Sequence, residues 1–263
     1  MSLDRWRRGF GTALSFTAFG IGGLGIGLVA VPLMKVVVRD TAWRQYLARC
    51  LIQNCFRCFI SLMRGLGVLD YRLEHIERLH RPGLLVLANH PSLIDVIFLL
   101  AHTPHADCIV KGRLATNPFT RGPIRAAGYI TNQDPEKVLE AARESLLKGN
   151  SLILFPEGTR TTPQHPIVFK RGGANIALRT GTAITPVLIQ CLPTTLTKGE
   201  PWYHIPEQKV RIDIRVLDDL PVNDDNQQPT GQVARRLTRR LSDHFNRELE
   251  QLNHERNTHD SVA

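Results

Sequence analysis

Residues 85–95 read Leu-Val-Leu-Ala-Asn-His-Pro-Ser-Leu-Ile-Asp, and this segment decides the predicted fold. An apolar run stops at Asn89-His90, a proline follows, and a second apolar run begins around Asp95. The pattern predicts a buried strand that ends at His90, a tight turn, and a helix whose first turn carries Asp95. An imidazole at the tip of a strand, followed by such a carboxylate, is a suitable pair of general base and orienting group.

A second segment, residues 152–160, has the same design and reads Leu-Ile-Leu-Phe-Pro-Glu-Gly-Thr-Arg. A proline ends the predicted strand, Gly158 permits a tight backbone, and Glu157 and Arg160 place opposite charges at its tip. A strand-end loop with glycine, a hydroxyl and arginine can hold a phosphate bidentately; a plain turn with a surface ion pair is the alternative. We expect this strand end and that of residues 85–90 to face one cavity.

From about residue 67, apolar strands alternate with helical patterns. Strands are predicted at residues 68–73, 84–88, 108–110, 128–131, 152–155, 184–191 and 210–216, and helices at about 92–101, 114–126, 135–148 and 171–180. This alternation predicts an α/β fold with a mixed, largely parallel sheet flanked by helices, in which sites collect at the carboxyl ends of strands. A last, arginine-rich helix is predicted at 229–252, and the tail after Asn253 is expected to be disordered.

The N-terminal part of the chain has a different character. Residues 9–34 carry no charge and would form a helix roughly 39 Å long, enough to cross a hydrocarbon core of about 30 Å. Whether this run spans the bilayer or dips into it stays open, and a helical hairpin or interfacial anchor is favoured. Residues 41–66 form a second apolar helical pattern with cations, which suits a membrane interface; a helix packed on the core is the alternative. The predicted organisation is membrane-associated helices at 1–66, a catalytic domain at 67–253 and a tail at 254–263.

The composition of the chain limits the classes of molecule that the protein is expected to bind. The chain has 263 residues, 43% of them hydrophobic, and a net charge of +9, which favours nucleic acid or an anionic membrane surface. No motif of a nucleic-acid module is present, and aromatics at 6% are too few for a stacking platform, so no nucleic-acid partner is expected. The five scattered cysteines argue against a disulfide framework. Cys55 and Cys58 lie in an apolar helical pattern without a second ligand pair, so no metal site is expected.

Histidine followed by aspartate at the same spacing occurs twice, at His90–Asp95 and at His102–Asp107. The second pair belongs to a polar loop before a strand, and we interpret it as chance. His90 and Asp95 would not share one face of a helix, so they meet only if His90 precedes the helix and folds back over its first turn. Pro91 favours that arrangement. Taken alone, the pair also fits a structural histidine and a carboxylate at a helix start.

The segments 89–95 and 155–160 together resemble the PlsC-like glycerolipid acyltransferase family, typified by 1-acylglycerol-3-phosphate acyltransferases. Residues 90–95 match its first block and residues 155–160 its third, in the expected order and at the expected distance. Residues 184–187, Ile-Thr-Pro-Val, match its fourth block. The resemblance covers roughly residues 67–216 and implies a fold similar to that of glycerol-3-phosphate acyltransferases.

The resemblance also implies roles for individual residues. His90 acts as general base on an acceptor hydroxyl, and Asp95 orients its imidazole, so that the hydroxyl attacks an acyl thioester directly. The residues implied to position the acceptor are Glu157, Gly158, Thr159 and Arg160, with Arg160 on its phosphate. No cofactor or metal is implied, because acyl-CoA or acyl carrier protein is the donor substrate. The implied partners are a lipid membrane and a lyso-lipid, with the catalytic domain on the cytoplasmic side (of the inner membrane, in a bacterium).

The second block departs from the family pattern. Lys111 is present, but Arg113 stands where an acid is common, and the usual arginine after the strand near residue 131 is missing. Arg121 or Arg125 is a candidate to supply that charge, and we count Lys111 and Arg121 among the substrate-binding residues. Because this block contacts the acceptor in the family, the departure leaves the acceptor open. Lysophosphatidate is the default, and another lyso-lipid or a specialised hydroxy-lipid is the alternative.

A third interpretation is that the protein is not an enzyme but a catalytically silent lipid-binding protein on the same fold. The presence of both His90 and Asp95 argues against it. The sequence therefore predicts a membrane-associated O-acyltransferase.

Overall fold

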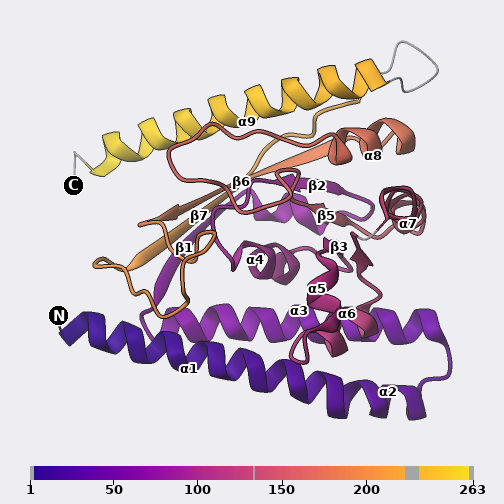
Figure 1. Cartoon of the computed structure of the whole chain (residues 1–263), viewed down its shortest axis with the longest axis horizontal. Helices are drawn as coiled ribbons and strands as arrows, with labels where there is room; N and C mark the ends of the chain where they lie inside the picture. Colours follow the sequence, from indigo (N-terminus) through magenta and orange to yellow (C-terminus); the bar gives the residue numbers. More distant parts are fainter. Residues whose placement is uncertain (1–2, 133, 223–230, 261–263) are drawn as a thin grey trace.

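The computed structural model describes residues 3–132, 134–222 and 231–260. Within these residues, one sheet has the strand order β1-β7-β6-β2-β5-β3-β4 (Figure 1). The strands are β1 (Leu69–Glu74), β2 (Leu85–Ala88), β3 (Asp107–Val110), β4 (Ile130–Thr131), β5 (Leu152–Leu154), β6 (Ile184–Leu192) and β7 (Val210–Val216). Neighbouring strands are parallel except β6 and β7, which are antiparallel. The predicted mixed, largely parallel sheet is confirmed, with strands close to their predicted positions.

Helices cover both faces of this sheet (Figure 1). They are α1 (Leu3–Gly25), α2 (Val31–Val37), α3 (Thr41–Gly65), α4 (Asp95–His102), α5 (Gly112–Thr116), α6 (Arg121–Ala127), α7 (Pro135–Leu147), α8 (Gly172–Thr180) and α9 (Gly231–Asp260). A π-helical turn, Ile26–Ala30, joins α1 to α2, and a 3-10 helix, Ile76–His80, precedes β2. One apolar core lies between the sheet and α3 and α4, and a second between the sheet and α7, α8 and α9.

The central strands are almost entirely apolar because helices bury both of their faces. Every residue of β2 is buried, and so is nearly all of β6. Such continuous apolar runs are typical of strands in the middle of a helix-covered parallel sheet. In β7, by contrast, buried residues alternate with less buried ones. The two strands that carry the site, β2 and β5, are therefore held rigidly in the middle of the sheet.

Two helix boundaries differ from the predictions. The pattern at 114–126, predicted as one helix, is broken into α5 and α6 around Asn117-Pro118. Proline disfavours the helical conformation in the residue before it, and Asn117 is extended, with ψ of 129°. The last helix continues to Asp260, where the sequence analysis expected a disordered tail; residues 261–263 and 229–230 lie outside the described residues. Leu252 is buried and Glu255 pairs with Arg215, which holds this extension against the sheet.

The N-terminal helices form a hairpin. Within the described residues, Leu3–Val37 is one continuous helix that is apolar and long enough, by these criteria alone, to cross a membrane. It turns at residues 38–40 into α3, where Asp40 caps the helix by accepting a hydrogen bond from Trp43 N (2.6 Å). One face of α3 is buried against the core, as the alternative interpretation of residues 41–66 proposed, and α1 lies outside it (Figure 1).

Glycines let the N-terminal helix approach α6 closely. A Cβ atom on Gly27 would lie 3.3 Å from the Cα atom of Gly122, and a Cβ on Gly23 would collide with the carbonyl oxygen of Phe119. Gly23 and Gly27 therefore serve a specific backbone contact. The contact places the second block of the sequence beside the N-terminal helix.

Candidate active site

The two predicted strand ends lie side by side. Strands β2 and β5 are parallel neighbours, with Leu87 opposite Leu154, so the segments that follow them leave the same edge of the sheet. This is the arrangement that brings sites to the carboxyl ends of parallel strands. Residues 89–95 and 155–160 are consequently in direct contact.

His90 and Asp95 form the predicted pair. Nδ1 of His90 lies 2.9 Å from Oδ2 of Asp95, and the main-chain N–H of Ser92 donates to the same oxygen (2.7 Å). Helix α4 begins at Asp95, so His90 precedes the helix and folds back over its first turn, as expected. The carboxylate is fully buried while 18% of the histidine side chain is exposed. With Nδ1–H directed at the carboxylate, Nε2 is left as the basic nitrogen.

The main chain of His90 is tied to the second segment. Its N–H donates to Oε1 of Glu157 (2.9 Å) and to Oγ1 of Thr161 (3.1 Å). The hydroxyl of Thr161 donates in turn to Oε1 of Glu157 (2.7 Å), and the N–H of Thr161 donates to the His90 carbonyl (2.7 Å). These bonds fix the spacing of the two segments. Thr161 was not predicted, because it lies one residue beyond the recognisable block.

Two further contacts hold the strand end and the imidazole ring. The ring of Phe155 stacks on that of His90, with centroids 4.2 Å apart and planes inclined by 26°. The side-chain amide of Asn89 bonds the main chain of Ile189 twice: Nδ2 donates to the carbonyl (2.7 Å), and Oδ1 accepts from the N–H (2.8 Å). Strand β2 is thereby joined to β6 directly before the histidine. The imidazole is thus pre-oriented from several sides.

Burial changes the pKa values of the two carboxyl groups of the site, Asp95 and Glu157. Burial raises the pKa of Asp95, against the opposing effects of His90, the Ser92 N–H and the charge of Arg160. Burial likewise raises the pKa of Glu157, opposed by its hydrogen bonds from Thr161 and His90. The imidazole and the hydrogen-bond donors around it therefore offset part of the effect of burial, which disfavours the charged form of both carboxylates.

A cluster of cations lies next to the His90–Asp95 pair. Burial lowers the pKa of Lys111, and so do the positive charges of Arg113, Arg160, Lys170 and Lys198. The structure thus brings together Lys111 and Arg160, both predicted as substrate-binding residues. It adds three cations that were not predicted for the site: Arg113 on α5, and Lys170 and Lys198 on two separate loops. Such convergence of basic side chains is suited to binding phosphate.

The loop after β5 is shaped by Gly158. Its φ of +68° lies in the left-handed region, and an added Cβ would meet Nζ of Lys170 at 2.8 Å. Glycine therefore lets this lysine lie over the loop. Thr159 is half-buried, and the guanidinium of Arg160 donates from Nη1 to the carbonyl of Leu196.

Arg121 lies elsewhere. It is an exposed residue at the start of α6, next to the close contact of Gly122 with the N-terminal helix. The second histidine–aspartate spacing does not form a pair: His102 Nδ1 bonds the carbonyl of Phe98 (2.8 Å), and Asp107 pairs with Arg49 (3.0 Å). Among the described residues, no group of His, Cys, Asp and Glu side chains is arranged to hold a metal ion.

Comparison with known proteins identifies the family. The model of the Acyltransferase family matches residues 70–190, which include both segments of the site. A 1-acyl-sn-glycerol-3-phosphate acyltransferase of Helicobacter pylori is 33% identical over 169 residues, covering 62% of this chain and 69% of that protein. The chain belongs to the acyltransferase family.

Other similar proteins agree with this assignment. A 1-acyl-sn-glycerol-3-phosphate acyltransferase of Saccharomyces cerevisiae is 26% identical over 210 residues, covering 76% of this acyltransferase and 67% of the yeast protein. The crystal structure of PlsC, the 1-acyl-sn-glycerophosphate acyltransferase from Thermotoga maritima, has the same fold. The TM-score is 0.63 at 21% identity, with 94% of this chain and 99% of that chain covered. Leu196 and Lys198 lie beyond the segment that the family model matches.

Proposed function

We propose that this acyltransferase moves a fatty acyl group from an acyl thioester to the free hydroxyl of 1-acyl-sn-glycerol-3-phosphate, giving phosphatidic acid. The observation that carries the proposal is the His90–Asp95 pair (2.9 Å) lying beside a cluster of cations. The pair supplies a base for the hydroxyl, and the cations suit an acceptor that bears a phosphate. The names of the relatives from Helicobacter and yeast support the same acceptor.

The reaction follows from the orientation of the imidazole. Nε2 of His90 takes the proton of the acceptor hydroxyl while its oxygen attacks the carbonyl carbon of the thioester. The buried carboxylate of Asp95 stabilises the imidazolium that forms. When the tetrahedral intermediate collapses, the C–S bond breaks and the proton on Nε2 passes to the leaving thiolate. The products are the ester and the free thiol, with no acyl-enzyme in between.

The remaining site residues divide into two groups. Glu157, with Thr161, acts on the main chain of His90 and so positions the base rather than the substrate. Arg160 and Lys111 bind the acceptor's phosphate, and Gly158 and Thr159 form the loop between base and phosphate. The donor is the thioester of CoA or of acyl carrier protein, both of which carry phosphates that suit a cationic site. No cofactor takes part in this scheme.

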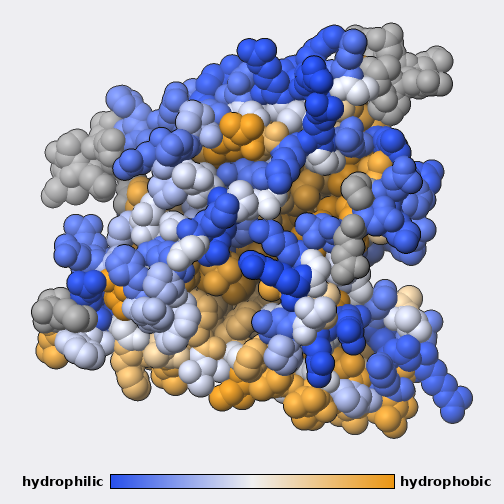
Figure 2. All heavy atoms as spheres, viewed as in Figure 1, coloured by the Kyte–Doolittle hydropathy of each residue, from blue (hydrophilic) through white to orange (hydrophobic). Residues whose placement is uncertain are grey.

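We also propose that the N-terminal helices attach the enzyme to the cytoplasmic surface of a membrane. Figure 2 supports this with a band of apolar residues along the lower edge of the molecule, where α1 and α2 lie. The exposed apolar side chains in this region include Trp6, Phe10, Ile21, Leu28, Leu33 and Val36. The other face of the helix packs on α3 and α6, which favours a helix lying in the interface over one that crosses the bilayer.

The test is an acyl-transfer assay with purified enzyme and a panel of acceptors. His90→Ala should abolish transfer while its thermal unfolding matches that of the wild type. Arg160→Ala should raise KM for 1-acyl-sn-glycerol-3-phosphate but leave a monoacylglycerol without phosphate unaffected. Retained transfer in His90→Ala would refute the mechanism, and equal loss on both acceptors would refute the phosphate role. Absence of transfer over the whole panel, with lipid binding preserved, would indicate a lipid-binding protein instead.

A further inference from the structure

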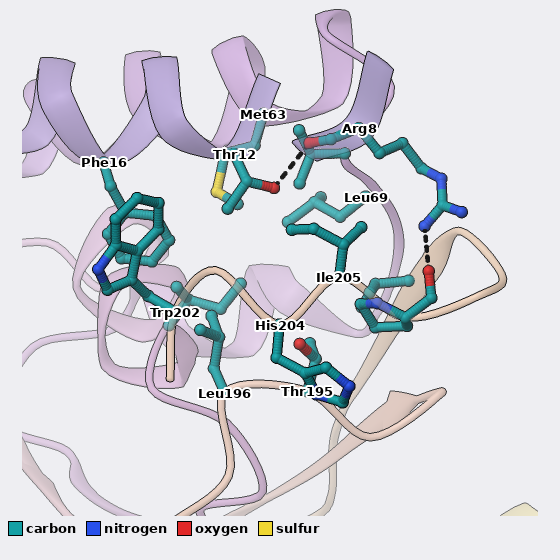
Figure 3. A pocket seen from close by; sticks show the side chains of 14 residues that line it. Arg8, Thr12, Phe16, Met63, Leu69, Thr195, Leu196, Trp202, His204 and Ile205 are labelled. Atoms are coloured by element: carbon teal, nitrogen blue, oxygen red, sulfur yellow. Dashed lines mark hydrogen bonds between the residues drawn. The ribbon is translucent and has the colours of Figure 1, made fainter. Parts of the chain in front are cut away.

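The N-terminal helix holds the loop between β6 and β7, residues 193–209, mainly through one arginine. Arg8 is a residue of α1, yet only 1% of it is exposed. Its Nη1 donates to the carbonyls of Pro206 (2.8 Å) and Gln208 (3.0 Å), and its Nη2 donates to that of Glu207 (2.7 Å). Figure 3 shows the guanidinium reaching from the helix to this loop. Three successive carbonyls are thus bound by one rigid, charged side chain.

A buried guanidinium requires partners, because an unpaired charge away from water is strongly unfavourable. Besides the carbonyls, Nε of Arg8 lies 2.8 Å from Oδ2 of Asp4 on the same helix. Arg5, one turn away, donates from Nε to the carbonyl of Ile205 (3.0 Å). The main chain at 205–208 is therefore fixed to the first turns of α1.

The other end of the same loop reaches the active site. The carbonyl of Leu196 accepts the hydrogen bond from Arg160, and Lys198 is one of the cations that act on Lys111. Leu196 has a φ of +54°, in the left-handed region that side chains with a Cβ rarely adopt. Such a conformation persists only where the surroundings determine it, and it is often found at functional sites.

Contacts of the β6–β7 loop with α1 and within the loop itself hold Leu196 in this conformation. Leu196 is 6% exposed and lines a small cavity of about 30 Å³ between the loop and α1, together with Thr12 and Phe16 (Figure 3). The ring of Trp202 packs on Phe16, with centroids 5.8 Å apart. Beyond Leu196, the N–H and hydroxyl of Thr197 both donate to Oε2 of Glu200 (2.8 and 3.0 Å). The loop is thus seated on α1 along its length.

We propose that Arg8 is a positioning residue for the acceptor's phosphate: it holds the β6–β7 loop on α1, so that the Leu196 carbonyl orients the guanidinium of Arg160. The inference rests on the proposed function, in which Arg160 binds that phosphate. It connects the helix that faces the membrane to the anion-binding part of the site.

The test is a set of steady-state measurements in which the acceptor concentration is varied. Arg8→Ala should raise KM for 1-acyl-sn-glycerol-3-phosphate about tenfold, the scale of one hydrogen bond to a charged group, with kcat within about twofold of wild type. KM for a monoacylglycerol should not change. Arg7→Ala is the matched control, because Arg7 is exposed and pairs with the same Asp4. It should leave both constants unchanged.

A double-mutant cycle tests whether Arg8 acts through Arg160. In the Arg160→Ala background, Arg8→Ala should add no further increase in KM; additive increases would overturn the inference. A fall in kcat with unchanged KM would show that Arg8 is merely structural, and would also overturn it. If Arg8→Ala does not fold, Arg8→Lys, which keeps one charged donor, should give an intermediate KM, and a wild-type KM would refute the proposal.

The same data separate this inference from the proposed function. If Arg160→Ala leaves KM for the phosphate acceptor unchanged, the proposed role of Arg160 fails and the inference fails with it. If Arg160→Ala raises KM but Arg8→Ala does not, only the inference about Arg8 fails.

Discussion

His90 is held by its side chain and its main chain independently. The imidazole meets Asp95 on one edge and Phe155 on one face, while the main-chain N–H meets Glu157 and Thr161. Each contact comes from a different part of the two strand-end segments. A general base needs this kind of rigidity, because proton transfer depends on a heavy-atom distance of about 3 Å.

Replacing Asp95 with Asn tests the electrostatic part of this arrangement. The amide keeps the size of the side chain, but the charge that stabilises the imidazolium is lost. We expect kcat to fall about 10³–10⁴-fold, as for orienting aspartates of histidine bases, with little change in the acceptor KM. The measurement is steady-state kinetics, with thermal unfolding as the control for folding. A loss of less than tenfold would contradict the role assigned to Asp95.

The lowered pKa of Lys111 predicts a pH dependence. Burial and neighbouring cations make this lysine lose its proton at a lower pH than an ordinary lysine does. As pH rises toward the ordinary value of about 10.4, the acceptor KM should therefore increase early, because the neutral amine no longer attracts phosphate. Lys111→Arg, which stays charged, should remove that increase. Equal KM profiles for wild type and variant, after correction for spontaneous thioester hydrolysis, would argue against this account.

At the scale of elements, α3 joins the N-terminal hairpin to the sheet through a buried ion pair. Nη2 of Arg49 lies 3.0 Å from Oδ2 of Asp107 at the start of β3, and Nε donates to the carbonyl of Ala127 (2.9 Å). The hydroxyl of Ser145 on α7 donates to the same carboxylate (2.9 Å). Burial raises the pKa of Asp107, and the charge of Arg49 opposes that rise. The pair therefore keeps a charged group in place inside the fold.

Arg49→Ala leaves the buried Asp107 without its counter-ion. We expect the free energy of unfolding to fall by about 3–5 kcal/mol, as for other broken buried pairs. Arg64→Ala is the matched control on the same helix, because its pair with Asp70 is half exposed and should contribute about 1 kcal/mol or less. Denaturant unfolding of both variants measures the difference. Similar losses in the two variants would contradict the importance given to burial.

On the scale of the whole molecule, direct contacts join the edge of the sheet that carries His90 to the apolar N-terminal face. The hairpin packs on α4 and α6, and its first turns hold the β6–β7 loop. A membrane bound along α1 and α2 would thus be held at a fixed orientation to His90. This geometry suits an acceptor whose acyl chain stays in the lipid while its headgroup reaches the base.

The proposed membrane face predicts the effect of adding charge to it. Phe10→Asp combined with Ile21→Asp should reduce partitioning onto anionic lipid vesicles at least about tenfold, because aspartate disfavours the membrane environment by roughly 3 kcal/mol at its core. Both side chains are well exposed, so folding should be unaffected. Leu147→Asp, at an exposed leucine at the end of α7, is the control. Vesicle sedimentation measures binding, and equal binding by all variants would exclude this face.

The strands and the His90–Asp95 pair follow from the sequence alone, because both are specified locally. Apolar runs, a proline at the turn and a carboxylate at a helix start fix β2, the turn and α4 within a dozen residues. The break at Pro118 and the extension of α9 were missed; the extension depends on contacts such as that of Glu255 with Arg215 on β7.

The set of cations that gather at the site, by contrast, is specified by long-range packing. The sequence predicts Lys111 and Arg121 as substrate-binding residues, whereas the structure sets Lys111 among Lys170 and Lys198 and places Arg121 beside the N-terminal helix. The path of the loop that carries Lys198 depends on Arg8, which lies 198 residues before its partner Pro206. Contacts across such a separation leave no periodic signal in the chain, so local patterns predict the strands and the base, and only the packed fold specifies the charges around them.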